Sequence, residues 1–395
     1  MAKILSVNLG SSTLKWRLFE MPEEQQIASG LVDFLDNTKA KITVKFGDQK
    51  KTRNFDEKLD LKQAIRVLME ELKSLKLVTQ LHEIVGVGHR VVAGGEVYKE
   101  SVVITKDVLQ QIDDLDIFAP LHNHLEVGGI ELFRQLMPWT TQVAVFDTAF
   151  HHTMPAENYL YGIPYDYYKK YGARKYGAHG TSVRYVSKRA AKLLNKPLTD
   201  LRLIVMHLGA GSSVTAVNKG KSLDTSMGFT PLDGLMMNTR SGQIDASLVP
   251  YLTKKLGLKD SAEMITILNS KSGLLGVSGI SDDQRELKKV AKTQPRAQLA
   301  LDMFANRVIK FVGSYIALMD GVDALIFTGG VGENSFEMRS QIMTSFDYVG
   351  ATIDATKNKV AGKEIDISEA DAKVKTLVIP TNEELMIARD VYARL

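Results

Sequence analysis

The sequence predicts an α/β protein that contains two copies of one fold. Apolar strand-like runs alternate with segments that place apolar residues at helical spacing, which is typical of the α/β class. A strand–turn–strand motif occurs twice, at residues 4–15 and 203–215. A chain of 395 residues is too long for one ordinary core, so two domains are expected. We therefore predict two similar halves facing each other across a cleft.

The repeated motif predicts two phosphate-binding turns. Each copy has a short apolar run, one polar residue, Leu-Gly and then small hydroxyl residues; the polar residue is Asn8 in the first copy and His207 in the second. Glycine and serine let backbone N–H groups approach an anion and donate to it.

The other elements follow from apolar periodicity. Strands are expected at residues 4–9, 14–19, 27–32, 41–46, 84–92, 142–147, 323–328 and 376–380. Helices are expected at 61–76, from about Ser182 to Leu194, and at the C-terminus, where Thr381 or Asn382 can cap the helix and acidic residues suit its dipole. Residues 155–180 are expected to form a connecting or lining segment. The basic cluster at 50–53 is expected to lie in a solvated loop.

Composition excludes several classes of function. The chain has no cysteine, which excludes disulfides, thiolate zinc sites and a cysteine nucleophile. Its net charge is only +4 and its basic residues form no long block, so neither a nucleic-acid nor a membrane partner is expected. No apolar run approaches the roughly 20 residues of a membrane span. The N-terminus lacks a signal-peptide pattern, so a cytoplasmic protein is expected.

Polar residues recur where apolar strands end. They are Asn8, Arg90, Asp147, His207 and Gly330. Ligands of α/β sheets bind beyond the strand ends, so these residues are candidates for one site.

The known short nucleotide and zinc motifs are absent. The chain has neither a P-loop nor a Rossmann fingerprint, and its histidines lack the HExxH spacing. His151 and His152 are expected on opposite faces of a strand in structural roles. His179 precedes a helix, where it suits an anion. Alternatively, Thr181 or Ser182 is the N-cap and His179 is a loop residue.

The combined motifs resemble those of the acetokinase family, which belongs to the superfamily of sugar kinases, heat-shock chaperones and actin. The resemblance spans essentially the whole chain. The segments that carry it are residues 8–15, 88–92, 119–123, 145–151, 179–182, 207–209, 225–232, 239–242, 327–334 and 379–384.

The resemblance implies a fold and an organisation. It implies duplicated ribonuclease H-like (actin-like ATPase) domains that flank a nucleotide cleft. Residues 1–150, joined by a C-terminal helix at 384–395, would form the N-terminal domain, and residues 151–383 the C-terminal domain with the nucleotide site. Members of the family are typically homodimers.

The resemblance also implies an activity: reversible transfer of the γ-phosphoryl group of ATP to acetate or another short carboxylate, giving an acyl phosphate and ADP. A carboxylic acid with a pKa of about 4 is ionised at neutral pH and needs no general base. The enzyme must align it with the phosphorus and neutralise charge. The implied cofactors are ATP/ADP and Mg²⁺, which Mn²⁺ can replace.

The resemblance assigns site residues by position. Four of them, Arg90, Asp147, His179 and Arg240, would be catalytic. The acyl substrate would contact Arg90, Val92, Leu121 and Pro231, and Mg²⁺ would be held by Asn8 and Glu383. The nucleotide would contact Lys15, His207, Leu208, Gly209, Ala210, Gly211, Asp283, Gln284, Arg285, Gly330, Val331, Gly332, Glu333 and Asn334.

The chain departs from the family pattern at a few positions. Ala210 stands where the family usually has Asn, and Ala178 where it usually has Phe. Other departures are Ala93 and Val183 for His, Asn238 for Gly, and Gln243 for an acid. Losing one preorganised donor at Ala210 can cost about 10²–10³ in turnover. Ala178 either enlarges the acyl pocket or leaves a gap that a neighbouring side chain fills.

Three other functions stay open at this point. A kinase acting on a sugar hydroxyl would use Asp147 as a base, although Arg90 and Arg240 suit an anionic acceptor. A propionate- or butyrate-preferring kinase would follow from an enlarged pocket. A nucleotide-binding regulatory protein without activity would follow from the departures.

Overall fold

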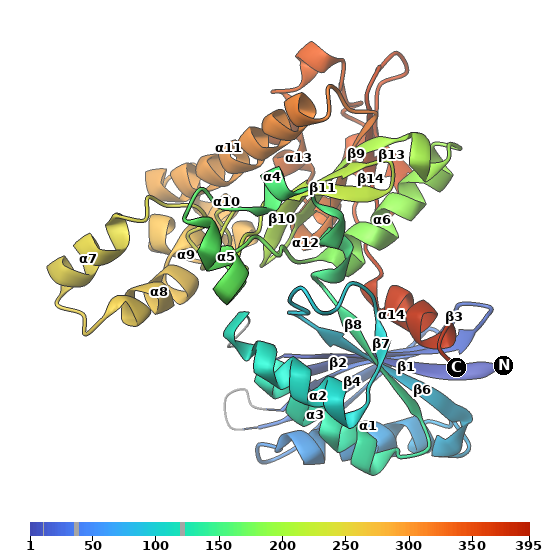
Figure 1. Cartoon of the computed structure of the whole chain (residues 1–395). Helices are drawn as coiled ribbons and strands as arrows, with labels where there is room; N and C mark the ends of the chain where they lie inside the picture. Colours follow the sequence, from blue (N-terminus) through green and yellow to red (C-terminus); the bar gives the residue numbers. More distant parts are fainter. Residues whose placement is uncertain (11, 35–38, 119–122) are drawn as a thin grey trace. The chain divides into compact units, whose positions relative to one another are not determined.

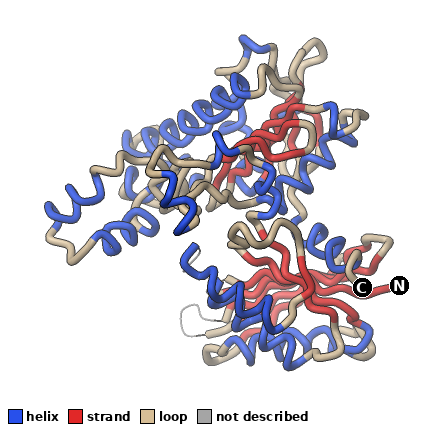
Figure 2. Tube along the Cα trace, viewed as in Figure 1, coloured by secondary structure: helices blue, strands red, loops and turns tan. Residues whose placement is uncertain are grey.

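The computed structural model describes residues 1–10, 12–34, 39–118 and 123–395. The chain divides into two compact units. The first comprises Met1–Phe150 and Asn382–Leu395, and the second comprises His151–Thr381. The described strands of each unit form one sheet, and helices pack on it (Figure 2).

The first unit contains an eight-stranded sheet in the order β5-β4-β3-β2-β1-β6-β8-β7 (Figure 1). Its strands are β1 (Ala2–Leu9), β2 (Thr13–Met21), β3 (Gln25–Asp33), β4 (Lys41–Phe46), β5 (Gln49–Asn54), β6 (Ile84–Val91), β7 (Val102–Val103) and β8 (Thr141–Phe146). Neighbours from β1 to β5 are antiparallel, whereas β6 runs parallel to β1 and β8. The carboxyl ends of β1, β6 and β8 therefore meet at one end of the sheet.

The helices of the first unit cover both faces of this sheet. They are α1 (Leu61–Ser74), α2 (Lys106–Asp114), α3 (Asn123–Leu136) and α14 (Glu383–Tyr392). Successive strand side chains point to opposite faces. Leu5 and Val7 share an apolar core with Ile65 of α1 and Phe133 of α3. Ser6 instead donates to the carbonyl of Glu384 in α14 at 2.7 Å. By the same alternation, Asn8 lies on the α14 face.

Two glycines of β6 let α14 lie close to the sheet. A Cβ atom at Gly88 would overlap Ile387 and Val391, and a Cβ atom at Gly86 would overlap Val391. The aliphatic residues and the methionine of α14 are buried, and Asn382 caps the start of the helix by accepting from the N–H of Leu385 at 3.2 Å. The last residues of the chain thus complete the first unit.

The second unit contains a six-stranded sheet in the order β11-β10-β9-β12-β14-β13. Its strands are β9 (Arg202–Leu208), β10 (Ser212–Asn218), β11 (Lys221–Thr225), β12 (Ala324–Thr328), β13 (Ile365–Asp366) and β14 (Lys375–Val378). β9, β12 and β14 are parallel, and β10 and β11 continue the sheet in antiparallel order.

Ten helices of the second unit surround or extend from this sheet in the described residues. They are α4 (Ala156–Tyr159), α5 (Tyr165–Tyr171), α6 (Gly180–Leu193), α7 (Leu248–Leu256), α8 (Ser261–Ser270), α9 (Gly273–Ser278), α10 (Gln284–Val290), α11 (Pro295–Leu318), α12 (Gly329–Asn334) and α13 (Phe336–Met343). Phe304 and Val308 of α11 belong to the core that includes Met206 of β9. Over both units, the described residues also form short 3₁₀ helices, at 81–83, 115–118, 149–153, 198–200, 347–349 and 357–359.

The two sheets confirm the predicted duplicated α/β fold. The order β3-β2-β1-β6-β8 in the first unit corresponds to β11-β10-β9-β12-β14 in the second, with the same strand directions. The repeated motif forms the β1–β2 turn in one unit and the β9–β10 turn in the other. Among the described residues, no helix is both long and apolar enough to cross a membrane.

Three local predictions were wrong. The cluster 50–53 lies in the exposed edge strand β5 rather than in a loop. His151 and His152 lie in a 3₁₀ helix and not on a strand. The expected connecting or lining segment 155–180 additionally contains the short helices α4 and α5, which the sequence did not predict. Neither Thr181 nor Ser182 is the N-cap of α6, because that helix begins at Gly180 after His179, whose backbone is left-handed with φ 61°.

Substituting Gly88 tests the docking of α14. Gly88→Ala should destabilise the protein by about 1–3 kcal/mol, because an added Cβ must push Ile387 and Val391 away from the sheet. The measurement is the free energy of unfolding from urea denaturation. Gly128→Ala in α3 is the matched control, since its Cβ meets no atom within 4 Å. Equal stability of the Gly88 variant and wild type would contradict the close packing.

Candidate active site

Charged and amide side chains of the first unit converge where its parallel strands end. Asn8 lies near the end of β1, Arg90 near the end of β6, and Asp147 directly after β8. Arg90 donates to Asp147 Oδ2 from Nη2 at 2.6 Å and from Nε at 3.0 Å. Its Nη1 donates to Asn8 Oδ1 at 3.3 Å. Sequence reasoning expected these three residues in one site, and they are in contact.

The cluster keeps the Arg90 guanidinium charged although it is largely buried. Burial opposes the charge, but the carboxylates of Asp147 and Glu383 outweigh it and raise the pKa of Arg90 above its ordinary value. Asp147 is itself buried, with 1% of its side chain exposed. A buried carboxylate of this kind is stable only when a cation compensates it.

Glu383 at the start of α14 is the second acid near Arg90. Burial raises the pKa of Glu383 to about 7; Arg90 opposes this rise, and the carboxylates of Asp147 and Glu384 add to it. Lys15 also lowers the pKa of Glu383, which brings Lys15 within electrostatic reach of this cluster. Lys15 pairs directly with Asn8 across β1 and β2, so the two side chains share one face.

The residues expected to contact the acyl group are distributed over both units. Val92 follows Arg90 and is buried next to Ala93. Pro231 lies in the second unit, where its carbonyl accepts from Arg240 Nη1 at 3.4 Å. Leu121 lies outside the described residues.

In the second unit, polar side chains hold the turn between β9 and β10. The N–H of Gly209 donates to Ser212 Oγ at 3.2 Å, and that hydroxyl donates to the Gly209 carbonyl at 3.0 Å. His207 Nδ1 lies 2.9 Å from Ser182 Oγ, which lies 2.7 Å from Thr381 Oγ1. The Ser212 hydroxyl thus holds the turn itself, while the hydroxyls of Ser182 and Thr381 hold His207 before it.

His179 and Arg240 both lie beside this turn. His179 Nδ1 is 2.9 Å from Ser213 Oγ, and its ring stacks on that of His207 with centroids 4.1 Å apart. A Cβ atom built on Gly211 would lie 3.5 Å from His179 Nε2 and 3.6 Å from Arg240 Nη1. The structure thus brings the expected residues His179, His207, Gly211 and Arg240 together.

Methionines fill the space beside Ala178. Ala178, Met227 and Met237 form one buried apolar cluster. Met237 Sδ lies 3.8 Å from Arg240 Nη1, the same nitrogen that contacts the Pro231 carbonyl. Of the two readings that the sequence left open for Ala178, the packing supports the filled gap.

A cavity of about 720 Å³ adjoins the turn and has the size of a small-molecule site. The residues expected to hold a nucleotide that line it are Gly209, Ala210, Asp283, Gln284, Arg285, Gly330, Val331 and Asn334. Sequence reasoning did not assign Asn238, Asp282, Lys288, Ser335, Phe336 and Glu337 to the nucleotide, and these residues also line the cavity. Of these residues, only Asn238 was singled out in the sequence, because it stands beside Thr239-Arg240 where the family usually has Gly.

Two residues expected at the nucleotide, Glu333 and Gly332, make contacts within the second unit. Glu333 Oε1 accepts from the N–H groups of Gly329 at 2.9 Å and Thr381 at 3.1 Å. The carbonyl of Gly332 accepts from Arg339 Nη1 at 2.8 Å. Neither residue lines the cavity. Gly329 has φ +77°, and a Cβ atom there would overlap the Leu208 backbone, so the residue after β12 lies close to the end of β9.

The described residues of the site offer few donors for a cation, and these donors are oxygen atoms, which are hard ligands. Among the residues that the structure describes, no group of three or more His, Cys, Asp or Glu side chains could hold a metal ion. Asn8 and Glu383 offer oxygen donors beside Arg90. Such a pair fits Mg²⁺, which usually keeps several waters and binds substrate phosphates.

The chain matches proteins of known family along its whole length. Residues 3–389 match the Acetokinase family. The chain is 63% identical to the acetate kinase of Lacticaseibacillus paracasei, covering all of both chains. It is 54% identical to the acetate kinase of Lactiplantibacillus plantarum, covering 99% of this chain and 98% of the relative.

Solved structures agree with these matches. The acetate kinase of Porphyromonas gingivalis has a TM-score of 0.92 and 41% identity, covering 100% of this chain and 99% of the other. A propionate kinase from Francisella tularensis has a TM-score of 0.93 and 42% identity, covering 100% of both chains.

The Arg90–Asp147 ion pair should contribute measurably to stability. Asp147→Ala should lower the free energy of unfolding by about 1–3 kcal/mol, because it leaves buried donors of Arg90 without their acceptor. The control is Asp56→Ala, whose fully exposed carboxylate lies 3.6 Å from Lys39 and should change stability by less than about 0.5 kcal/mol. Equal effects of the two substitutions in urea denaturation would refute the assignment.

Proposed function

The chain belongs to the acetokinase family, and on that premise we propose that it catalyses reversible, ATP-dependent phosphorylation of acetate to acetyl phosphate. The main support is the full-length similarity to relatives that are named acetate kinases. The partners are a small carboxylate and a nucleotide. The proposal includes a cytoplasmic homodimer, in keeping with the family.

Arg90 is proposed to orient the acceptor carboxylate. The acceptor is already ionised at neutral pH, so it needs alignment and charge neutralisation rather than a base. A guanidinium offers a planar fork to a carboxylate or phosphate. Asp147 holds two nitrogens of Arg90, so we assign it the orientation of Arg90 rather than proton abstraction.

His179 and Arg240 are proposed to stabilise the transferring phosphoryl group. Both approach Gly211 in the β9–β10 turn, where backbone N–H groups are also available. Ser213 fixes the His179 ring from Nδ1, which leaves Nε2 on the side of Gly211. His207, Leu208, Gly209, Ala210 and Lys15 would contact phosphates of the nucleotide, and the cavity lined by residues 283–285, Gly330, Val331 and Asn334 would hold the nucleoside.

Asn8 and Glu383 are proposed to hold Mg²⁺, or Mn²⁺ in its place. When bound, the cation neutralises charge on the phosphate oxygens. The ionised form of Glu383 is the one that binds a cation, so metal binding should compete with protonation of this residue.

The filled space beside Ala178 supports acetate over longer acids. Met227 and Met237 form one buried apolar cluster with Ala178, and Met237 touches Arg240. A methionine side chain adapts its shape to such gaps. The packing gives no support to an enlarged pocket for propionate or butyrate.

Trapping of acyl phosphate by hydroxylamine tests the activity. With Mg-ATP and acetate, wild type should form acetyl hydroxamate, while Arg90→Ala and Arg240→Ala should each lose about 10²–10³ in turnover. Arg66→Ala on the exposed face of α1 is the matched control and should retain full turnover. Full activity in both site variants would overturn the site, and no hydroxamate from wild type would overturn the function.

The acyl selectivity of a Met227 variant tests whether Met227 and Met237 fill the space beside Ala178. Met227→Ala should raise kcat/KM for butyrate relative to acetate by about 10-fold, because one methylene is worth about 10–200-fold in a hydrophobic pocket. The measurement is kcat/KM for acetate, propionate and butyrate. Ile265→Ala on the exposed face of α8 is the control, with an unchanged ratio expected. Equal use of acetate and butyrate by wild type would contradict the filled pocket.

A further inference from the structure

The backbone that follows Arg90 is held by side chains rather than by a strand. The pairing of β6 with β8 ends at Val91 and Phe146. Beyond it, the N–H of Val92 donates to Glu126 Oε2 at 3.1 Å, and the N–H of Ala93 donates to Asn123 Oδ1 at 3.2 Å. The next N–H, that of Gly94, donates to Thr148 Oγ1 at 3.0 Å.

Helix α3 supplies two of these three acceptors from its buried face. Asn123 is fully buried and also donates to the carbonyl of Ala93 at 3.1 Å. Glu126 has only 3% of its surface exposed. Because an N–H group left without an acceptor in the interior is costly, each contact fixes the strand end to α3.

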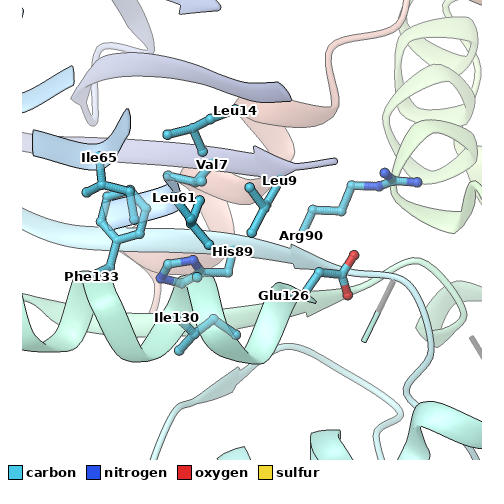
Figure 3. A pocket seen from close by; sticks show the side chains of 11 residues that line it. Val7, Leu9, Leu14, Leu61, Ile65, His89, Arg90, Glu126, Ile130 and Phe133 are labelled. Carbon is cyan, nitrogen blue, oxygen red and sulfur yellow. The ribbon is translucent and has the colours of Figure 1, made fainter. Parts of the chain in front are cut away.

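Glu126 differs from its neighbours because it can carry charge. Figure 3 shows its carboxyl group extending from α3 toward the end of β6, on the side where Arg90 lies. Together with Arg90 and His89 it lines a cavity of about 10 Å³, which has room for about one water molecule. The groups that act on Glu126 are Arg90 of β6 and Asp147 after β8, while His89 of β6 faces the same cavity and is bonded to Gln142.

We propose that Glu126 is a positioning residue for the acceptor site, which holds Val92 by accepting from its N–H and which attracts Arg90 only when it is ionised. This inference rests on the proposed function, because it assigns Arg90 and Val92 to the acceptor. Burial raises the pKa of Glu126 to about 8, against the opposing effects of Arg90 and the Val92 N–H. The carboxyl group is therefore neutral at pH 7 and gains charge beside Arg90 as the pH rises through about 8.

Three variants separate positioning from a general effect on folding. Glu126→Ala removes the acceptor of the Val92 N–H and should raise the KM for acetate about 10-fold, with the KM for ATP changed less than about 2-fold. Glu126→Gln keeps an acceptor oxygen of similar reach and should restore the KM for acetate at pH 7 to within about 3-fold of wild type. Glu131→Ala, on the exposed side of the same helix, is the control and should leave both KM values unchanged.

The pH profile gives a readout that a purely structural role would not change. The KM for acetate of wild type should rise as the pH passes through about 8, because the new charge competes with acetate for Arg90. The rise near pH 8 should be absent in Glu126→Gln, in which Glu383, with a pKa of about 7, still titrates near Arg90. Identical profiles for wild type and Glu126→Gln would overturn the electrostatic part of the proposal.

Hydrogen exchange tests the contact between Glu126 and the backbone without any measurement of turnover. Hydrogen exchange of the amides at residues 92–94 should be faster in Glu126→Ala than in wild type, and unchanged exchange would overturn the positioning role. An unchanged KM for acetate, or equal rises in the KM values for acetate and ATP, would also overturn it. If Glu126→Ala does not fold, Glu126→Gln and its pH profile decide. Loss of hydroxamate formation in wild type would refute the proposed function, while the exchange result would still test the contact.

Discussion

The ion pair between Arg90 and Asp147 is the interaction on which the first unit's site depends. Three parallel strands end together, and this topology brings a guanidinium, an amide and carboxyl groups into a space with little water. Each of these groups is expensive to bury alone, so the cluster holds only as a set. Glu383 and Glu126 add acids on either side of Arg90, from α14 on one face of the sheet and from α3 on the other. The direct partners that hold the guanidinium are Asp147 and Asn8.

The second unit uses the same strand–turn–strand frame for a different purpose. Where the first copy places Asn8 opposite Lys15, the second places His207 opposite Ser213. The second turn is then braced by hydroxyl groups and by two stacked imidazole rings rather than by ions. One backbone arrangement thus supports an ion-pair cluster in one unit and, in the other, a hydrogen-bonded turn with His179, His207 and Arg240 beside it.

The sequence predicted the elements whose signals are local. Apolar runs identified β1, β6, β8 and β9, and a polar residue at the end of a parallel strand was a sound guide to Asn8 and Arg90. What it could not predict depends on side chains far apart in the chain. Ser182 was considered only as a cap, yet it joins His207 to Thr381. Glu126 lies 34 positions from Val92, and nothing near it in the chain indicates that contact. β5 was missed because an exposed edge strand carries no apolar pattern.

The return of α14 to the first unit has a consequence for synthesis of the chain. Residues 1–150 emerge from the ribosome first, but the helix that packs on Gly86 and Gly88 comes from residues 382–395. At about 5–20 residues per second, the intervening segment 151–381 takes roughly 10–50 s to make. During that time one face of the first sheet lacks its helix, and Arg90 lacks the acid at position 383. The first unit therefore stays incomplete, with one face of its sheet exposed, until synthesis ends, while the second unit can already fold. The first unit is thus the part that a chaperone would protect.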